Sequence, residues 1–406
     1  MTRLRTAHPY WLDREKKRKV PRYWPLRGDI RADVAIVGGG ITGATVAWML
    51  ANEGLSVILV EALRVGRGST AASTALLMQE PDEDVLGLAE RYGMKQSRRI
   101  WELCRDASDS FIQLLSDLHI SCELAPRDSI YFTRDQARTL RREYQLRRRA
   151  GFDGRWLDPA DLRRVAGISG YAIRTAGNAQ ADPYRACVGL IQKSVQRGAR
   201  IFERSPALHV RRVGRDMSVT TPRGQVRAET VVIATGFATP EFRPLFARFR
   251  MRQTYVLATA PLSVRHRRNL GLSDVMLWDT DRPYHYARWT KDHRLMLGGG
   301  DRPPTHGRSH GRVFREATRD VRDFFLQLYP ALAGVRFEYA WEGLFATTPD
   351  GLPYVGPHRR YPGHLFALGY GGNGMTFSLL AARLICERLT GRVTTDHDLF
   401  SFARLR

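Results

Sequence analysis

Lysine is scarce in this chain of 406 residues, although the formal charge is +23. Arginine therefore carries almost all of the positive excess, and it is spread along the chain, with short clusters such as those at 141–142, 147–149 and 265–268. Such a spread favours a general replacement of lysine by arginine over a single binding stripe, so we expect no nucleic-acid partner. Peripheral contact with an anionic membrane surface stays open. The lysines are Lys16, Lys17, Lys19, Lys95, Lys193 and Lys291.

Cysteine is also rare, with Cys104, Cys122, Cys187 and Cys386 far apart in the chain. No CxxC pair and no His/Cys spacing typical of a metal site occurs, so we predict buried thiols in a reducing compartment and no metal. No uncharged apolar run approaches 18 residues, which argues against a transmembrane segment. The N-terminus lacks the apolar core of a signal peptide, and we expect a cytoplasmic protein.

Residues 33–61 predict a dinucleotide site, because an apolar strand, a glycine turn, a helix and a second apolar strand follow one another. Gly38 suits the tight turn, Gly40 allows backbone to approach a pyrophosphate, and Gly43 allows close packing of helix and strand. The helix that opens at Ile41 and Thr42 offers free N–H groups to phosphates. Glu61 follows the second strand, where a carboxylate can accept both ribose hydroxyls and would repel the 2′-phosphate of NADP.

A second glycine turn lies near the other end of the chain. Residues 365–368 predict a buried strand, residues 369–374 read Gly-Tyr-Gly-Gly-Asn-Gly, and a helix is expected from Met375 to Leu389. One interpretation is tight strand–helix packing alone. The other is that this helix N-terminus stabilises negative charge, as the N1–C2=O edge of a reduced flavin requires.

Four stretches together resemble the FAD-dependent oxidoreductases of the D-amino-acid-oxidase superfamily. This group includes glycine and sarcosine oxidases, D-amino-acid dehydrogenases and γ-glutamylputrescine oxidase-like enzymes. The stretches occur in the family's order and span most of the chain. They are residues 32–61, residues 66–75 (GRGSTAASTA), residues 231–236 (VVIATG), and the run from WEGLF at 341–345 through DGLPYVG at 350–356 to GYGGNGMTF at 369–377.

The resemblance implies an α/β (α+β) fold, in which a glutathione-reductase-type, Rossmann-like FAD-binding domain is interleaved with an antiparallel-sheet substrate domain. Residues 1–29 would form an N-terminal arm whose aromatic side chains pack on the body. Residues 30–80, 165–250 and 340–406 would form the FAD-binding domain, and residues 81–164 and 251–339 the substrate domain. Periodicity further predicts helices over 85–120, 135–150, 183–196 and 312–328, and strands around 129–133, 253–258, 283–289 and 294–297.

The resemblance also assigns cofactor contacts residue by residue. Gly38, Gly40 and Gly43 would face the pyrophosphate, and Glu61 the adenosine ribose. Val210 would flank the adenine and Gly236 would close the second strand. The relatives that bind flavin through a cysteine have no counterpart here, since Cys386 lies within a predicted helix, so FAD is expected to bind non-covalently. Gly68, Ser69, Thr70 and Ser73 would line the phosphate and ribityl chain, and Gly371, Gly372, Asn373, Gly374, Met375 and Thr376 the isoalloxazine edge.

The expected substrate site is the strand at 284–288, where period-two alternation places Tyr284, Tyr286 and Arg288 on one face. Arg288 would bind a substrate carboxylate through two hydrogen bonds. The alternative is an exposed sheet face on which arginine covers aromatic rings. On the neighbouring strand Arg252 shares a face with Thr254. His285 and His293 are expected to be structural or turn residues.

The predicted function is oxidation of the C–N bond of a small amine or amino acid to an imine, by hydride transfer to flavin N5. Electrons would pass to oxygen or to another acceptor. A hydroxy-acid or glycerol-phosphate-type dehydrogenase on the same fold is the nearest alternative, and an anionic substrate would suit the basic charge. An RNA-modifying flavoprotein and a non-catalytic binding module are alternatives of other classes.

Overall fold

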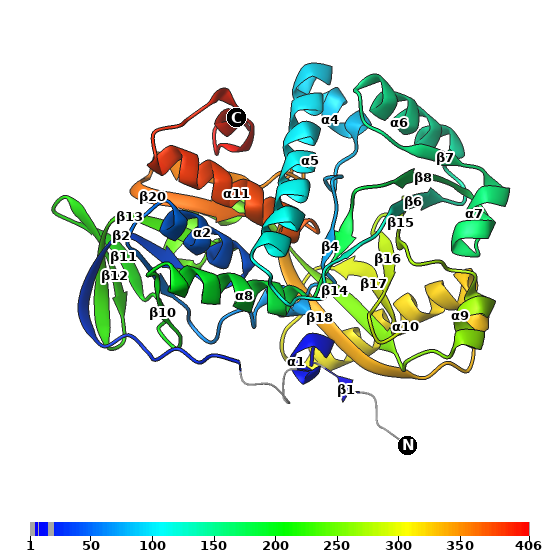
Figure 1. Ribbon diagram of the computed structural model, residues 1–406, viewed down its shortest axis with the longest axis horizontal. Coiled ribbons are helices and arrows are strands. Elements are labelled where there is room, and N and C mark those ends of the chain that lie inside the picture. The colour runs from blue at the N-terminus through cyan, green and yellow to red at the C-terminus, as the bar shows by residue number, and fades with distance from the viewer. Residues whose placement is uncertain (1–4, 7, 15–19, 406) are drawn as a thin grey trace.

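The computed structural model describes residues 5–6, 8–14 and 20–405, which form two large sheets with helices around them (Figure 1). The first sheet is built on parallel strands. Its central strand segments 57–60 and 231–233 are buried and rich in β-branched residues, as strands covered on both faces usually are. The parallel strands are β10 (Arg200–Phe202), β3 (Val57–Val60), β2 (Gly28–Val37), β13 (Gly224–Gly236) and β20 (Tyr361–Leu368). Antiparallel additions are β11 (His209–Val213), β12 (Asp216–Thr221) and β19 (Tyr354–His358).

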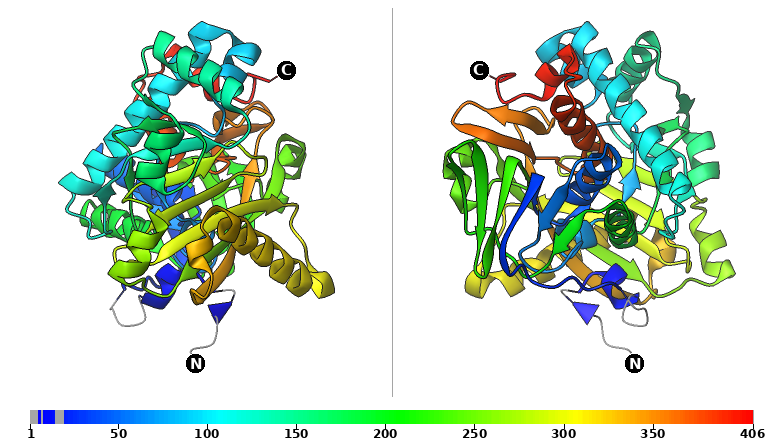
Figure 2. Two further views of the ribbon diagram at one scale, coloured as in Figure 1. Left: turned by 90° about the vertical axis from the view of Figure 1, so that its right-hand side faces the viewer. Right: turned by 60° about the vertical axis from the view of Figure 1, so that its left-hand side comes forward.

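Three helices pack together on one face of this first sheet: α2 (Ile41–Asn52), α8 (Pro183–Gln196) and α11 (Gly374–Leu389). The right-hand view of Figure 2 shows α2 and α11 side by side over the strands. Helix α2 is apolar around almost its whole circumference, because it lies between the sheet and its two neighbouring helices. Both glycine turns therefore enter helices that are anchored on the same sheet.

The second sheet has nine strands and is antiparallel except where β1 pairs with β18 and β15 with β6. Helix α10 (His310–Leu328) packs across β14 and β17, while α6 (Ala137–Arg149), α7 (Pro159–Ala166) and α9 (Val264–Leu270) lie around the sheet (Figure 1). The strands in spatial order are β1 (Arg5–Thr6), β18 (Phe337–Thr347), β14 (Arg250–Thr259), β17 (Leu295–Arg302), β16 (His285–Trp289), β15 (Met276–Asp279), β6 (Ser129–Thr133), β8 (Tyr171–Thr175) and β7 (Arg155–Leu157).

The chain passes between the two sheets several times, as an interleaved arrangement requires. A small sheet of β4 (Leu76–Leu77), β9 (Ala179–Gln180) and β5 (Ala125–Pro126) lies where the chain crosses. Strands β8 and β18 belong to the second sheet, although the ranges 165–250 and 340–406 place most of their residues in the FAD-binding domain. We therefore propose that these two domain boundaries lie after β8 and after β18. The other domain boundaries are proposed as the sequence predicts them.

Several predicted elements are confirmed. The predicted strand at 129–133 is β6, and the helix predicted to start after Asp182 is α8, where Asp182 Oδ1 accepts a hydrogen bond of 3.0 Å from the Arg185 N–H. The helical pattern predicted over 85–120 is confirmed, but it forms two helices. Gly93 adopts a φ of +78° and separates α4 (Val85–Tyr92) from α5 (Met94–Asp117), because this backbone conformation cannot continue a helix.

The N-terminal arm is partly helical rather than wholly extended. Tyr10 and Trp11 lie in α1 (Tyr10–Arg14) and are almost completely buried, which confirms that these two rings pack on the body. Trp24 is instead exposed. The lysines of the arm lie outside the described residues. Among the described residues, no helix is both long and apolar enough to cross a membrane.

Candidate active site

A cavity of about 800 Å³ runs between the two sheets and is lined by both glycine turns. One part is formed by Gly38, Glu61 and Val210 on the first sheet, and the opposite part by Thr254, Trp278 and Tyr286 on the second. The volume lies in the range typical of small-molecule and cofactor sites. Predicted cofactor residues that line the cavity are Gly38, Gly40, Ile41, Thr42, Glu61, Gly68, Ser69, Thr70, Ser73, Val210, Gly236, Gly371, Gly372, Asn373, Gly374 and Met375.

The first glycine turn is shaped by two close backbone approaches. A methyl group on Gly38 would lie 2.6 Å from the backbone oxygen of Ala234, and one on Gly43 would overlap the backbone oxygen of Gly38. Gly43 does not line the cavity, so its contact with a pyrophosphate stays a prediction, whereas its predicted packing role agrees with this position. Helix α2 starts at Ile41, and its N-cap Gly40 has no capping side chain. Gly40, Ile41 and Thr42 line the cavity, so this helix N-terminus opens into it.

Glu61 stands at the end of β3 beside this turn. Its Oε2 accepts a hydrogen bond of 2.7 Å from the Gly39 N–H, and its Oε1 accepts one of 2.8 Å from the Leu63 N–H. Arg64 and Arg67 line the same part of the cavity and bring positive charge to it. This combination of a carboxylate, two arginines and an open helix N-terminus suits a ribose attached to a pyrophosphate.

The segment from Gly68 to Ser73 closes the next part of the cavity through the short helix α3 (Ser69–Ala72). Ser69 Oγ donates to the Leu344 oxygen at 2.6 Å, and the Ser73 oxygen accepts from Trp11 Nε1 at 2.8 Å. Thr70 Oγ1 accepts from the Ile41 N–H at 3.0 Å. The arm, α3 and α2 are thereby connected around one wall of the cavity.

The second glycine turn opens α11 without a side-chain cap, so a second helix N-terminus faces the same cavity. Asn373 Nδ2 instead donates to the Glu80 oxygen at 2.5 Å, and the Gly372 N–H donates to Asp82 Oδ2 at 2.5 Å. Thr376 is fully buried and donates to the Met78 oxygen at 2.8 Å. Thr376 does not line the cavity, so its place along the flavin edge stays a prediction.

Tyr284 and Tyr286 line the cavity opposite this turn, as their shared sheet face predicts. A methyl group on Gly298 would overlap the Tyr286 ring, so glycine there allows the ring to lie flat against β17. Tyr286 Oη lies 3.4 Å from Thr254 Oγ1. Three further lining residues, Asp82, Trp278 and Tyr370, were not predicted. Tyr370 lies within the second glycine motif, whereas Asp82 and Trp278 lie outside the motifs quoted above.

Arg288 lies outside the cavity, which corrects its predicted role in binding a carboxylate. Its side chain is almost completely buried and Nη1 donates to the backbone oxygens of Ala75 and Ala181 at 3.0 and 3.1 Å. Its guanidinium also lies 5.2 Å from the Trp11 ring centroid, and burial lowers the pKa of Arg288 to about 10. The strand alternation is right, but α1 and Ala75 cover this stretch of the face. Arg252 is half-buried and does not line the cavity either.

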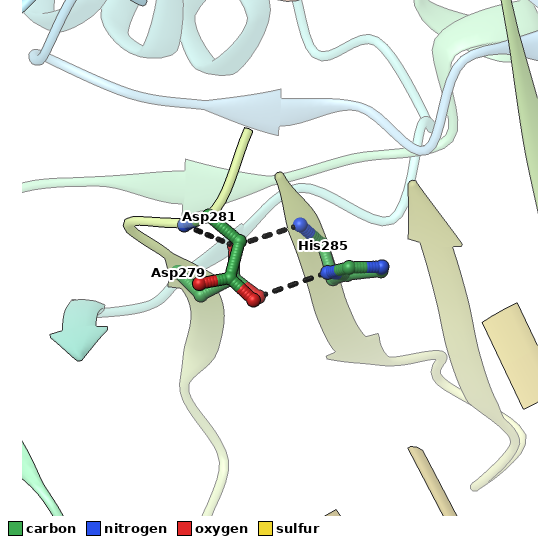
Figure 3. A group of neighbouring side chains, drawn as sticks. All are labelled: Asp279, Asp281 and His285. Carbon is green, nitrogen blue, oxygen red and sulfur yellow. Dashed lines mark hydrogen bonds and ion pairs between the residues drawn. The ribbon is translucent and has the colours of Figure 1, made fainter. Parts of the chain in front are cut away.

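The structure also brings Asp279, Asp281 and His285 together at the start of β16 (Figure 3). Asp279 Oδ1 accepts from the N–H groups of Asp281 and His285, and Oδ2 lies 3.0 Å from His285 Nδ1. The His285 ring stacks on Phe324 at 3.7 Å. These contacts shape the β15–β16 turn and agree with the structural role expected for His285.

The amino-acid sequence matches a known protein family over most of its length. A family model described as FAD dependent oxidoreductase (DAO) matches residues 33–388. The chain belongs to this family. γ-Glutamylputrescine oxidoreductase of Escherichia coli is 28% identical over 90% of this chain and 85% of its own length. Glycine oxidase of Bacillus subtilis is 24% identical over 91% of this chain and 96% of its own.

Solved structures of this fold superpose over nearly the whole chain. Glycine oxidase from Geobacillus kaustophilus gives a TM-score of 0.76 at 21% identity, covering 93% of this chain and all of that one. L-amino acid deaminase from Proteus myxofaciens gives 0.77 at 16% identity, covering 96% and 97%. The expected α/β fold, the oxidoreductase class and the dependence on FAD are thus confirmed.

The residues of this DAO enzyme fit FAD. Two uncapped helix N-termini open into one cavity, as an anionic pyrophosphate and a flavin edge that gains negative charge both favour. Trp278 Nε1 is buried beside the cavity without a hydrogen-bond partner among the described residues. All four cysteines are described and buried, and none lines the cavity.

Acids dominate the charge near Tyr284. Burial raises the pKa of Asp82 to about 7, and the neighbouring Glu83 adds to this, while the hydrogen bond from Gly372 and the charge of Arg282 oppose it. Burial likewise raises the pKa of Asp301 to about 6, against a hydrogen bond from Thr254 and the charge of Arg252. Burial also holds the pKa of Tyr284 well above its ordinary value, so its hydroxyl stays protonated.

Proposed function

We propose that this DAO enzyme oxidises the C–N bond of a small amine or amino acid to an imine, which water then hydrolyses. Bound FAD supplies the chemistry, because its N5 accepts the hydride. The relatives named γ-glutamylputrescine oxidoreductase and glycine oxidase support a nitrogen-containing substrate. The observation that carries the proposal is the aromatic chamber of Trp278, Tyr284 and Tyr286, which faces the second glycine turn in the cavity that also holds the nucleotide motif.

The chamber residues perform two tasks in this proposal. The aromatic rings exclude water from the substrate and hold it against the second glycine turn, which limits its orientations. Tyr284 and Tyr286 stay protonated, because burial raises the pKa of both phenols, so each hydroxyl can donate a hydrogen bond to the substrate. Oxidation of a neutral amine requires no further general base.

We infer that Gly40, Ile41, Thr42 and Ser69 hold the pyrophosphate region, Glu61 the ribose, and Gly371 to Met375 the flavin edge. Their places along the cavity support this order. We also infer non-covalent binding of FAD, since the four cysteines lie away from the cavity lining. Reoxidation of the reduced flavin by oxygen or by an artificial acceptor would identify the electron acceptor.

The test is an anaerobic screen of the purified yellow holoenzyme against amines, amino acids, hydroxy acids and glycerol phosphate. We expect the flavin absorbance to bleach with amines or amino acids and to return on admission of oxygen or of an artificial acceptor. Acid precipitation should release all colour into the supernatant. Bleaching by hydroxy acids or glycerol phosphate, with amines inert, would reject the proposal, and colour in the pellet would reject non-covalent binding.

A further inference from the structure

The part of the cavity beside Tyr284 contains a carboxylate but no cation. Asp82 lines this part, and a methyl group on Gly372 would overlap the Tyr284 hydroxyl and lie 3.2 Å from Asp82 Oδ1. The two side chains therefore converge on the backbone of the second glycine turn. Among the described residues that line the cavity, the only arginines are Arg64 and Arg67, which lie beside Glu61 at the nucleotide end, and no lysine lines it.

The backbone that carries Asp82 is fixed on both sides. The Gln79 N–H donates to Asn178 Oδ1 at 2.8 Å, and the Glu80 oxygen accepts from Asn373 Nδ2 at 2.5 Å. Two residues beyond, Asp84 caps α4 through a 2.7 Å hydrogen bond from the Gly87 N–H. Asp82 is thus held in the cavity wall rather than carried on a free loop.

Aromatic rings surround the same space. Trp278, Tyr284, Tyr286 and Tyr370 line it, the Trp278 ring stacks on Tyr131 at 3.9 Å, and the Tyr284 and Tyr286 centroids are 6.0 Å apart. The negative faces of aromatic rings attract organic cations, and a carboxylate beside them strengthens this attraction. A substrate carboxylate in this chamber would instead meet Asp82, and no arginine of this part of the lining would bind it directly.

We propose that Asp82 and the aromatic chamber form a cation site that determines specificity, so that the substrate is an amine without an α-carboxylate whose second, non-reacting nitrogen is the bound ammonium, while the reacting amine is neutral. This inference rests on the proposed function and narrows it from amines and amino acids to amines. Arg282 lies outside the lining, is exposed and donates to the Asp281 oxygen. Its charge lowers the pKa of Asp82, but this effect is smaller than the rise that burial causes.

The first test compares substrates that differ only by the α-carboxylate, namely putrescine with ornithine and cadaverine with lysine. We expect anaerobic flavin reduction to be at least about tenfold more efficient with each diamine. Equal or greater efficiency with ornithine and lysine would overturn the cation site while leaving amine oxidation intact. Bleaching by none of the amines and amino acids screened would instead reject the proposed function.

The second test measures binding without turnover, using choline and its uncharged isostere 3,3-dimethylbutan-1-ol, each titrated against the flavin spectrum of the holoenzyme. Choline should bind at least about tenfold more tightly than the isostere, and Asp82→Asn should abolish this preference. Glu83→Gln is the matched control. Glu83 neighbours Asp82 but does not line the cavity, since its side chain packs against Gly351, so the preference should persist.

The pH dependence of choline binding separates a direct role of Asp82 from a structural one. The groups that face Asp82 are Glu83, Asp301, Arg282 and Tyr284. Binding should tighten as the pH rises through the pKa of Asp82, about 7, and should lose this step in Asp82→Asn. If Asp82→Asn retained both the preference for choline and the pH step, the cation site at Asp82 would be overturned. Wild-type enzyme that bound neither choline nor its isostere would overturn it as well.

Discussion

At the scale of single residues, the nucleotide motif depends on the lack of a side chain at Gly43 and Gly38. The hydrogen in place of a side chain on Gly43 allows α2 to meet the backbone oxygen of Gly38, and no flexible side chain stands there to move aside. The turn can therefore present its N–H groups to the cavity only while position 43 has no Cβ. The requirement is steric, and it holds whether or not Gly43 touches a ligand.

Gly43→Ala should lower the free energy of unfolding by about 3 kcal/mol, because the added methyl overlaps backbone. FAD should also be lost on gel filtration. Gly311→Ala, in the exposed first turn of α10, is the control, since its methyl would meet only Arg315 Nη1 at 3.6 Å and should stabilise by about 0.5–1 kcal/mol. Urea unfolding and the flavin-to-protein absorbance ratio measure both effects. If Gly43→Ala had the same free energy of unfolding and the same flavin content as the wild type, the turn would be able to relax around the added methyl group.

At the scale of elements, the DGLPYVG stretch at 350–356 is held by contacts with the C-terminal segment. Asp350 accepts hydrogen bonds from Arg404 Nε at 2.7 Å and Nη2 at 3.0 Å, and the Arg404 guanidinium lies 4.0 Å from the Tyr354 ring centroid. Both partners are almost fully buried. Tyr92 of α4 donates to the same carboxylate at 2.5 Å. The aspartate of this stretch thus joins the C-terminal segment, β19 and α4.

Arg404→Ala should destabilise the enzyme by about 3–5 kcal/mol at pH 7, because it leaves Asp350 buried without its partner. Arg404→Lys should rescue part of this loss. Burial alone would raise the pKa of Asp350, but hydrogen bonds from Arg404, Tyr92 and Thr348 and the charge of Arg404 hold it below its ordinary value.

The sign of the pH dependence follows from that lowered pKa. Stabilisation by the pair is complete above the ordinary carboxyl pKa of about 4 and disappears as the pH falls through the lower native value. The stability difference between wild type and Arg404→Ala in urea should therefore shrink on acidification below about pH 4. Arg312→Ala, which removes an exposed pair with Glu316, should change little. A difference that does not vary with pH would contradict the ion-pair explanation.

At the scale of the whole molecule, the charge of +23 opposes compaction. Many arginines lie in exposed ion pairs, which contribute little each, whereas the net repulsion acts over the entire surface. Because the Debye length falls to about 10 Å at 0.1 M salt, modest ionic strength should weaken this repulsion more than it weakens buried pairs.

The melting temperature of the holoenzyme should therefore rise as sodium chloride is increased from about 20 to about 300 mM. Over this range the Debye length falls from more than about 10 Å to less than about 8 Å. Circular dichroism melts would measure it, with sucrose at equal osmolality as the control for solvent exclusion. A melting temperature that falls with salt would show that attractive surface pairs outweigh the net repulsion.

Local sequence determined the parts of the site that depend on backbone conformation. The glycine turns at 38–43 and 369–374, the acid at the end of β3 and the Asp182 cap are short-range features, because turn geometry and helix N-termini place strict demands on neighbouring residues. The membership of one family and the two-sheet α/β fold followed from such motifs in their order along the chain.

Only the tertiary structure decided which side chains surround the substrate. Asp82 and Trp278 line one cavity because β15 pairs with β6, 147 positions away in register, and because residues 78–82 are hydrogen-bonded to the second glycine turn and α11. Arg288 shares a sheet face with Tyr286, yet α1 covers Arg288, whereas Tyr286 lines the cavity. Alternation along a strand is a local property, but what packs over each position depends on contacts between distant segments.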